Sequence, residues 1–557
     1  MFKGHPRGLY VAFFANMGER FGYYTMIAIF VLFLQAKYGF GPGTSGQIYS
    51  IFIALVYFLP LFGGLLADRV LGYGKTISLG LITMFFGYLL LMIPTSMGTG
   101  FWLVALALVV IAIGTGFFKG NVQALVGNLY DDPRYSAKRD NAFSLFYMGI
   151  NVGAMFAPTA AEVVSNWVLG RYGYTYDSRI PAMAHSFLQG KANVHDYLQV
   201  ANMQDASVTA ETLKTFSENY INVLSRSYHF SFGVACISLI ISMIIFWSFR
   251  KHYKSADVTE KQKSVDKSYK DSIVVLTPQQ TKQRLIALGL VFSVIIFFWM
   301  SFFQNGACMT YFARDYTQPI VGKATNLWFD LFGLIPLALA VTGLYFAFRK
   351  TETIKVKLLG MGVAILFGGL AYLRFSTYGD QNPFTPQKFQ HFNPFFIVAL
   401  TPLVIAFNTY LAKKGKEPSS PKKIGIGMLI AAVGFGILVI GSLGLPSPKS
   451  LGTLVAPANS LVTPYWLIGS YFTLTIAELF LSPIGISFVS KIAPPKYKGL
   501  MQGGWFAGLA GGSYLVGIIC IFWEKLNLSS LWLILVFCCV TSAIIMFSLL
   551  KRLESIK

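Results

Sequence analysis

The sequence predicts an all-α membrane protein, and three observations support this fold class. Fourteen apolar segments of about 20 residues recur along the chain, each long enough to cross a bilayer as a helix. Of the 557 residues, 55% are hydrophobic and only 12% are charged, whereas a soluble protein carries about 25% charged residues. The net charge of +22 comes largely from lysines and arginines in short loops between apolar segments, which is the positive-inside pattern and does not indicate nucleic-acid binding. We therefore expect a multi-pass protein of the inner (plasma) membrane with both termini in the cytoplasm.

The predicted spans form two groups, separated by a Lys-rich cytoplasmic linker at 250–284. We expect an N-terminal six-helix bundle over 1–249 and a C-terminal bundle over 285–557, which includes an extra helix pair at about 328–373. The spans are about 9–36, 45–66, 76–94, 100–127, 142–168, 229–249, 285–312, 328–348, 356–373, 393–412, 423–443, 464–489, 499–523 and 529–550.

Residues 169–228 are polar with interspersed aromatics and are expected to form an extracytoplasmic insert. The segment from Val208 to Ser225 has the spacing of an amphipathic helix. The insert is either a simple connection between the fifth and sixth spans or a cap that docks a partner or gates the pathway.

The first span carries a polar stripe. Asn16, Glu19, Arg20, Tyr23 and Tyr24 follow the i, i+3, i+4, i+7, i+8 spacing that places side chains on one helix face. A charge at the centre of a bilayer costs about 2.5–3.5 kcal/mol on insertion scales, so this acid and base are expected to pair or to line a wet cavity. We interpret the stripe as part of a transport pathway. The alternative is a buried Glu–Arg pair that joins helices, although such pairs contribute little net stability.

A charged turn follows the second span. Asp68 and Arg69 end that segment, and Lys75 begins the next one after a glycine-containing turn. An acidic residue at a helix end can hold a basic turn and a neighbouring helix end, in a contact that forms in one transport state and breaks in another. We predict a gating role for Asp68, Arg69 and Lys75, with an ordinary solvated turn as the alternative.

The fourth and fifth spans add polar groups to the same cavity. Lys119 lies too far inside its span for the ammonium to reach the membrane surface easily, so we predict a second buried cation. Tyr147 and Asn151 share one face of the fifth span, beside small residues that permit close helix packing.

Four motifs occur in order along the N-terminal half. They are His5-Pro6-Arg7-Gly8-Leu9, Glu19-Arg20-Phe21-x-Tyr23-Tyr24, Ala67-Asp68 with Gly74-Lys75-Thr76-Ile77, and Phe146-Tyr147-x-x-Ile150-Asn151. Together they resemble the proton-dependent oligopeptide transporter family, a branch of the major facilitator superfamily that moves di- and tripeptides and, in plants, nitrate and other solutes. The resemblance implies the major facilitator fold of two six-helix bundles, here with two extra transmembrane helices.

The sequence departs from the family pattern at three positions. Relatives read Trp-x-x-Phe-Glu-Gln-x-Gly in the seventh span, whereas this chain has Phe303 where that glutamate is expected. Asn16 replaces the first glutamate of the family's Glu-x-x-Glu-Arg pattern, and Ile27 stands where a second basic residue is usual. Two carboxylates and one cation of the family are therefore absent from the predicted cavity.

The C-terminal half matches the family better. Asn393 lies in a Phe-Asn-Pro motif, and Glu478, Ser482 and Pro483 belong to a segment that resembles the family's Glu-Leu-x-x-Ser-Pro-x-Gly. Pro483 would let its helix bend at a gate. Trp505 lies where the eleventh of the family's twelve spans could form the wall of a side-chain pocket.

These residues predict how a peptide is held. Arg20 and Lys119 in the N-terminal half would take the peptide carboxylate, and Glu478 and Asn393 in the C-terminal half would take its amino group, as the resemblance also implies. Binding to both halves would pull them together, as alternating access around a midplane site requires. The remaining contacts to backbone and side chains are expected from Tyr23, Tyr24, Asn151, Trp299, Ser482 and Trp505.

Proton coupling needs a carboxylate whose protonation responds to burial or to loss of its cation. Glu19 and Glu478 are the candidates that remain. The sequence leaves open an uncoupled or differently coupled facilitator of peptides, a carrier of another amphoteric or anionic solute, and a non-transporting membrane sensor.

An enzyme is not expected. The chain has no Gly-x-Ser-x-Gly and no His-Glu-x-x-His motif, and its five cysteines lack metal-ligand spacing. We predict no cofactor and no metal. Small peptides, protons and the lipid bilayer are the expected partners, nucleic acid is not, and a monomer would suffice for transport.

Overall fold

The computed structural model describes residues 4–259, 276–349, 352–451, 457, 460–494 and 497–555, and within them the chain is nearly all helical. The predicted linker is described as far as residue 259 and again from 276; its middle, 260–275, lies outside the described residues. The long helices of the first half are α1 (Arg7–Tyr38), α2 (Pro42–Phe58), α3 (Pro60–Leu66), α4 (Tyr73–Met92), α5 (Phe101–Leu129), α6 (Arg139–Arg171) and α9 (Leu213–Ser248).

The second half has more interruptions. Its helices are α12 (Pro278–Phe302), α13 (Cys308–Asp315), α14 (Lys323–Phe329), α15 (Leu331–Phe348), α16 (Ile354–Ser376), α17 (Phe392–Lys413), α18 (Ser420–Gly441), α19 (Pro448–Leu451), α20 (Tyr465–Ile492), α21 (Lys498–Ile521), α22 (Leu528–Ser548) and α23 (Leu550–Glu554). Short 3₁₀ or π turns are η1 (Ala67–Leu71), η2 (Ser136–Lys138), η3 (Arg250–His252), η4 (Lys254–Ala256), η5 (Phe303–Gly306) and η6 (Pro386–His391). Two short strands, β1 (Ile320–Val321) and β2 (Asn382–Pro383), pair antiparallel.

Thirteen helical stretches of the described chain are long and apolar enough to cross a membrane. The prediction of fourteen spans also included the segment of α6, which is 33 residues long but is not among the thirteen. It carries Asn151, Glu162 and Ser165, and it packs against α1 and α9. The polar residues of α6 are typical of a membrane helix that faces other helices and not lipid. The predicted all-helical membrane fold is confirmed.

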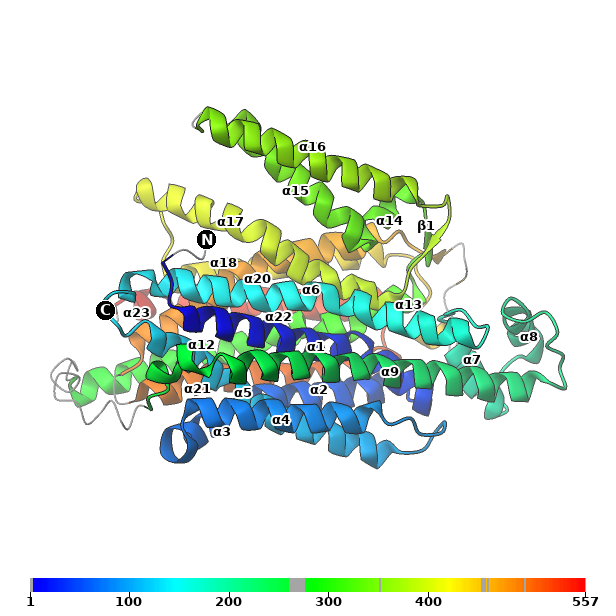
Figure 1. The fold of residues 1–557 in the computed structure, drawn as a ribbon. Helices are drawn as coiled ribbons and strands as arrows, with labels where there is room; N and C mark the ends of the chain where they lie inside the picture. The colour runs from blue at the N-terminus through cyan, green and yellow to red at the C-terminus, as the bar shows by residue number, and fades with distance from the viewer. Residues whose placement is uncertain are drawn as a thin grey trace.

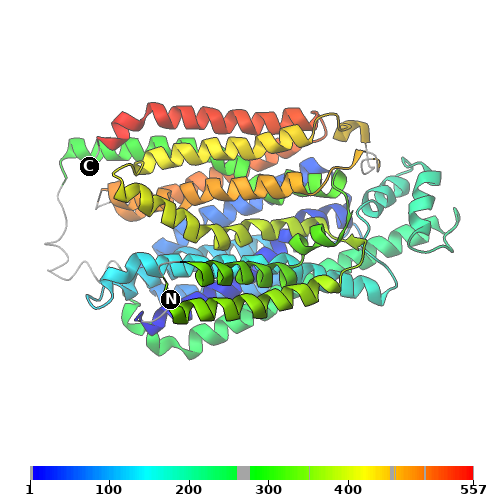
Figure 2. The same cartoon turned by 90° about the horizontal axis from the view of Figure 1, so that it is seen from above.

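The long helices run side by side in one bundle (Figures 1 and 2). Both chain ends lie at the same end of the bundle as η3 and the start of α12, which we call the linker end, and α7 (Ile180–Leu188) and α8 (Val194–Asn202) project from the opposite, distal end. Within the first half α1 packs against α6 and α9, and α4 packs against α5. Within the second half α18 packs against α20 and α22. The contacts of α2 with α21 and of α6 with α17 join the two halves.

The insert differs from the prediction. The helix expected from Val208 to Ser225 is not separate from the sixth span, because α9 runs unbroken from Leu213 to Ser248. Its first turns are covered by aromatic packing: Phe216 contacts Tyr197 of α8, and Tyr220 contacts Tyr174. The amphipathic pattern was therefore correct, and the break between insert and span was not.

The extra helix pair forms a hairpin of α15 and α16, set at the side of the bundle (Figure 1). The two helices approach closely at Gly343 and Gly360, where a Cβ on Gly343 would lie 2.6 Å from the carbonyl oxygen of Gly360. At its distal end the hairpin touches α6 through an apolar cluster of Leu331 and Leu334 with Met155.

Candidate functional site

The charged stripe of the first span is buried in α1. Arg20 donates from Nε and Nη2 to the two carboxylate oxygens of Glu19, at 2.5 and 2.6 Å, and both side chains are almost fully buried. The guanidinium also lies 4.7 Å from the ring centre of Tyr23, which packs edge-on against Tyr24. The stripe is therefore a single cluster, and Arg20 is occupied by its own helix neighbour.

Lys119 on α5 is in a different environment. Its ammonium lies 3.6 Å above the ring centre of Tyr57 and 5.7 Å from that of Phe506. Among the residues that the structure describes, no carboxylate forms an ion pair with it. A cation–π contact lowers the cost of the buried charge but leaves the ammonium available to an anion.

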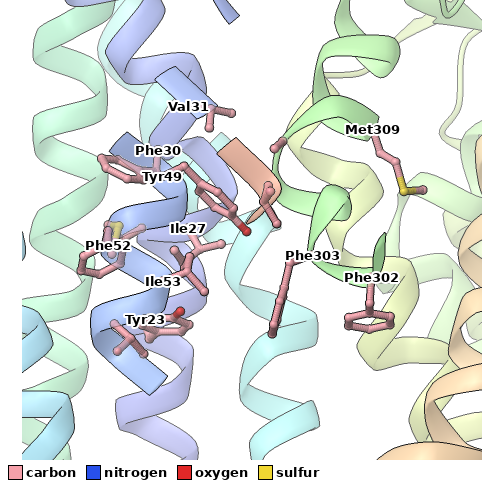
Figure 3. Close-up of a cluster of buried hydrophobic side chains, with 14 of the residues drawn as sticks. Tyr23, Ile27, Phe30, Val31, Tyr49, Phe52, Ile53, Phe302, Phe303 and Met309 are labelled. Carbon is pink, nitrogen blue, oxygen red and sulfur yellow. The ribbon is translucent and has the colours of Figure 1, made fainter. Parts of the chain in front are cut away.

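Phe303 stands at the centre of an aromatic stack where relatives are expected to have a carboxylate. Its ring stacks on Trp299 at 5.1 Å between ring centres and meets Tyr57 at 5.3 Å. Figure 3 shows Phe303 between the side chains of α1 and α2, including Ile27 and Tyr49, and the neighbouring Phe302. Positions 27 and 303, where relatives are expected to carry charged residues, are thus occupied by apolar side chains. Their contacts link the two halves.

Glu478 on α20 is held by both halves. Asn393 of α17 donates to its Oε2 at 2.8 Å, and Tyr147 of α6 donates to its Oε1 at 3.2 Å. Asn393 also donates to Thr475 Oγ1 at 3.2 Å. Glu478 and Asn393, both predicted to take the amino group of a peptide, are thus bonded to each other, and the hydroxyl of Tyr147 is a further partner that the site prediction did not include.

Several predicted site residues have unpaired buried atoms. Asn16 Nδ2, Trp299 Nε1 and Ser482 Oγ have no hydrogen-bond partner among the described residues. Asn151 donates to the backbone carbonyl of Tyr147 in its own helix. Leaving a buried donor unpaired costs about 1–3 kcal/mol, so such atoms mark places where a bound ligand could supply the missing partner.

Pro483 lies inside the unbroken helix α20. Two residues on, Gly485 lets the ring of Trp505 pack directly against the helix backbone, because a Cβ at this glycine would overlap the indole. Trp505 itself is buried. The structure thus places Trp505 against Gly485 of α20, and its role as the wall of a side-chain pocket stays a prediction.

The predicted gating turn lies at the linker end. Asp68 accepts a hydrogen bond from Tyr73 at 2.7 Å, while Arg69 and Lys75 are exposed. The next helix is held by a residue that the sequence analysis missed: Asp257 accepts from the backbone N–H of Gly74 at 2.8 Å.

The segment that carries Asp257 is fixed by a second missed residue. Asn128 of α5 donates to the carbonyls of Ala256 and Val258 at 2.9 and 2.8 Å. Asp257 follows the basic Arg250–His252 of η3 in a stretch without helical periodicity, so no local pattern indicated that it caps α4. Only the fold brings positions 74, 128 and 257 together.

A set of contacts at the distal end was also missed. Arg314 of α13 donates to Gln35 of α1, and Tyr311 donates to the carbonyl of Pro42 at 3.2 Å. Glu162 of α6 accepts from Thr385 at 2.7 Å and pairs with Lys388 at 2.9 Å. These bonds tie the first half to the second at the end away from the linker. They join segments more than 200 residues apart, so no spacing along the chain could indicate them.

The charged residues of the predicted site are divided between the two halves of the chain. In the described part of the chain, no group of three or more His, Cys, Asp or Glu side chains is placed to hold a metal ion. The charged groups are instead distributed between the halves, with cations on α1 and α5 and a carboxylate on α20.

Comparison with known proteins gives consistent results. The chain matches the model of the POT family over residues 74–279 and 379–533. It is 30% identical to the uncharacterized transporter YclF of Bacillus subtilis (strain 168), in an alignment that covers 91% of this chain and 85% of that protein. It is 27% identical to dipeptide and tripeptide permease A of Citrobacter koseri, covering 93% and 85%. Among solved structures, a peptide transporter POT in complex with alafosfalin shares the fold with a TM-score of 0.65 at 22% identity, covering 100% of this chain and 96% of that one.

Proposed function

This chain belongs to the POT family, and from that membership we propose that it transports di- and tripeptides by alternating access, with protons as the coupling ion. The observation that carries the proposal is the separation of charge: Lys119 and Arg20 belong to the first half, and Glu478 to the second. A peptide with a carboxylate at one end and an ammonium at the other fits this polarity. The name of the permease from Citrobacter koseri supports the same substrate class.

Lys119 is the better placed of the two cations for the peptide carboxylate. Arg20 already makes a two-pronged contact with Glu19, whereas Lys119 lies against aromatic rings and forms no ion pair within the described residues. An incoming carboxylate therefore gains a charge-assisted hydrogen bond at Lys119 without displacing a protein partner. Arg20 would contribute only after Glu19 releases it.

The peptide ammonium would join Glu478. This carboxylate accepts two hydrogen bonds in the structure, and a carboxylate has about four lone-pair positions, so it can accept more. Trp299 Nε1 and Ser482 Oγ, which lack partners among the described residues, would hydrogen-bond the peptide backbone. The aromatic rings of Tyr23, Tyr24 and Trp505 would tolerate different peptide side chains.

Coupling would depend on the pair of Glu19 and Arg20. A proton on Glu19 removes its negative charge, which weakens the contact and frees Arg20 for the substrate. Phe303 cannot take up a proton, so any coupling at that position is excluded by its chemistry. Entry of one proton supplies about 2.3 kcal/mol per 100 mV of membrane potential, which is enough to concentrate a solute.

Alternating access would use the interruptions in the helices. The seventh predicted span is broken at Phe303–Gly306, and Gly306 there lies so close to Tyr49 that any side chain would overlap it. The distal contacts of Glu162 and Arg314 would open when the halves rock apart, and the linker end, which we place in the cytoplasm, would close. Pro483, inside α20, would let this helix bend.

The test is uptake of a labelled dipeptide into proteoliposomes, with and without an imposed inward proton gradient. We expect the labelled dipeptide to accumulate inside the proteoliposomes above its equilibrium concentration, and a protonophore to abolish this accumulation. If the dipeptide only equilibrates, to the same extent with and without the proton gradient, the result would favour the second candidate, an uncoupled facilitator. The apolar side chain of Phe303 is the specific argument for that candidate. Absence of dipeptide flux would refute peptide transport and point to another amphoteric solute or to a sensor.

A further inference from the structure

A polar cavity lies outside the proposed transport site. It has a volume of about 330 Å³ and opens between α6 and the α15–α16 hairpin at the distal end. Its walls come from five parts of the fold: α6, α14, the hairpin, β2 and η6. No residue that lines it belongs to the proposed peptide site.

Two ion pairs face this cavity, and together they make it neutral. Glu162 pairs with Lys388 at 2.9 Å, and Arg374 of α16 pairs with Asp330 at 2.6 Å. Two cations and two carboxylates favour a ligand that carries both signs of charge over one with a net charge.

The cavity also offers unused hydrogen-bonding groups. Arg374 donates to Asp330 through Nε, so its two terminal nitrogens have no carboxylate partner within the described chain. The Arg374 side chain is 47% exposed. A guanidinium fork of this kind matches a phosphate group. On the opposite wall Thr159 Oγ1 is buried and lacks a partner among the described residues.

The rim of the cavity is apolar and faces outward. Val163 is 58% exposed and Phe332 is 61% exposed, and both line the opening. The α15 span begins at Leu331 and the α16 span ends at Ser376, so the cavity lies at the depth where hydrocarbon gives way to headgroups. Polar contacts inside and apolar side chains at the mouth fit a lipid better than a free solute.

We propose that this cavity binds the headgroup of a zwitterionic phospholipid with a primary amine, of the ethanolamine type. The phosphate would contact the terminal nitrogens of Arg374, and the ammonium would donate to the carboxylates of Glu162 and Asp330. A choline headgroup has no N–H to donate, and a glycerol headgroup leaves the lipid with a net negative charge. The acyl chains would lie against Phe332 and Val163, and the lipid would join the hairpin to α6.

The test is native mass spectrometry of the purified protein in detergent, with equal amounts of phosphatidylethanolamine, phosphatidylcholine and phosphatidylglycerol that carry the same acyl chains. We expect the ethanolamine lipid to be retained about tenfold over the choline lipid, as one or two charge-assisted hydrogen bonds would give. Arg374→Gln should weaken binding of the ethanolamine lipid about tenfold, by the same estimate. Lys355→Gln, exposed at the other end of α16, should leave it unchanged.

A second variant separates binding from folding. Arg374→Lys keeps the charge and an ion pair with Asp330 but lacks the planar fork, so we expect an intermediate loss of lipid at an unchanged melting temperature. Equal retention of the choline lipid, or wild-type lipid binding in both Arg374 variants, would overturn the proposal. Displacement of the lipid by millimolar dipeptide would overturn it as well, and would assign the cavity to peptides. None of these outcomes depends on whether the protein transports peptides.

Discussion

Replacement of Glu478 by Gln tests the proposed recognition of the peptide ammonium. Glu478 is 8% exposed and accepts hydrogen bonds from Asn393 and Tyr147. Glutamine has the same shape and can still accept from Asn393 through its one oxygen, so the change removes the charge and turns the other position, which faces Tyr147, from an acceptor into a donor. A hydrogen bond to a charged group contributes about 1.5–3 kcal/mol. Since 1.4 kcal/mol is a factor of ten, Glu478→Gln should weaken dipeptide binding by about 10- to 150-fold.

The assay is counterflow of labelled dipeptide in proteoliposomes without a proton gradient, so that a role of Glu478 in coupling does not affect the result. The matched ligand is the N-acetylated dipeptide, which has no ammonium. Acetylation should weaken binding to the wild type and have little effect on binding to the Glu478→Gln variant. Acetylation and the substitution each remove the same interaction, the one between the peptide ammonium and the Glu478 carboxylate. Glu417→Gln, at an exposed carboxylate outside the proposed peptide site that pairs with Lys423, should behave as wild type. Equal losses for the free and the acetylated peptide in Glu478→Gln would refute the reasoning.

Three further substitutions test coupling, packing and pH dependence. Glu19→Gln removes the carboxylate that holds Arg20, so we expect proton-driven accumulation to be lost while counterflow persists. Gly485→Ala places a methyl group against the ring of Trp505, and such overpacking should lower the unfolding free energy by about 1–3 kcal/mol, measured as a fall in the thermal midpoint. Burial lowers the pKa of His185 below its usual 6.5, so the unfolded chain takes up a proton before the folded one does. His185 should therefore contribute a loss of stability as the pH falls below 6.5, and His185→Gln should reduce the pH dependence seen in melting curves.

Each of these substitutions has a matched control. Gly436→Ala adds a methyl group where the neighbouring space is open and should leave the midpoint unchanged. His195→Gln, at an exposed position in α8, should keep the pH dependence. Glu211→Gln, exposed in the distal insert, should keep proton-driven accumulation. The coupling argument would be contradicted if proton-driven accumulation survives Glu19→Gln. The packing argument would be contradicted if the Gly485→Ala protein is as stable as the wild type, and the pH argument if the pH dependence is unchanged in His185→Gln.

Much of the fold could be predicted from the sequence because membrane spans are a local property. Twenty apolar residues must form a helix in a bilayer, where every backbone group has to be paired within its own segment. The hairpin at 331–376 was therefore found within a few residues of its ends. The family, expected from the motifs around Arg20, Lys75 and Asn151, is confirmed by the match to the POT family model.

Boundaries were predicted less well where tertiary packing overrides the local pattern. The polar start of α9 was assigned to the insert because its hydropathy is low. In the structure, Tyr197 of α8 covers Phe216, and Tyr174, in the loop before α7, covers Tyr220. This packing lets the helix continue beyond its apolar part. In α6, too, the local pattern and the packing differ. Glu162 lowers the mean hydropathy of this helix, but in the fold Thr385 and Lys388 satisfy its carboxylate.

Composition and helical spacing are enough to predict which chemical groups this protein places in its membrane helices: Glu19, Arg20, Lys119 and Glu478, with Phe303 where a carboxylate is expected. Charge within an apolar span is costly and therefore conspicuous in the sequence. How these groups are paired follows from the folded arrangement of the helices. Arg20 is held by Glu19 and Lys119 by aromatic rings, while Tyr147 reaches Glu478 across 331 positions of sequence. Pairing depends on distances of a few ångströms between different helices, and helix packing sets these distances while local sequence does not.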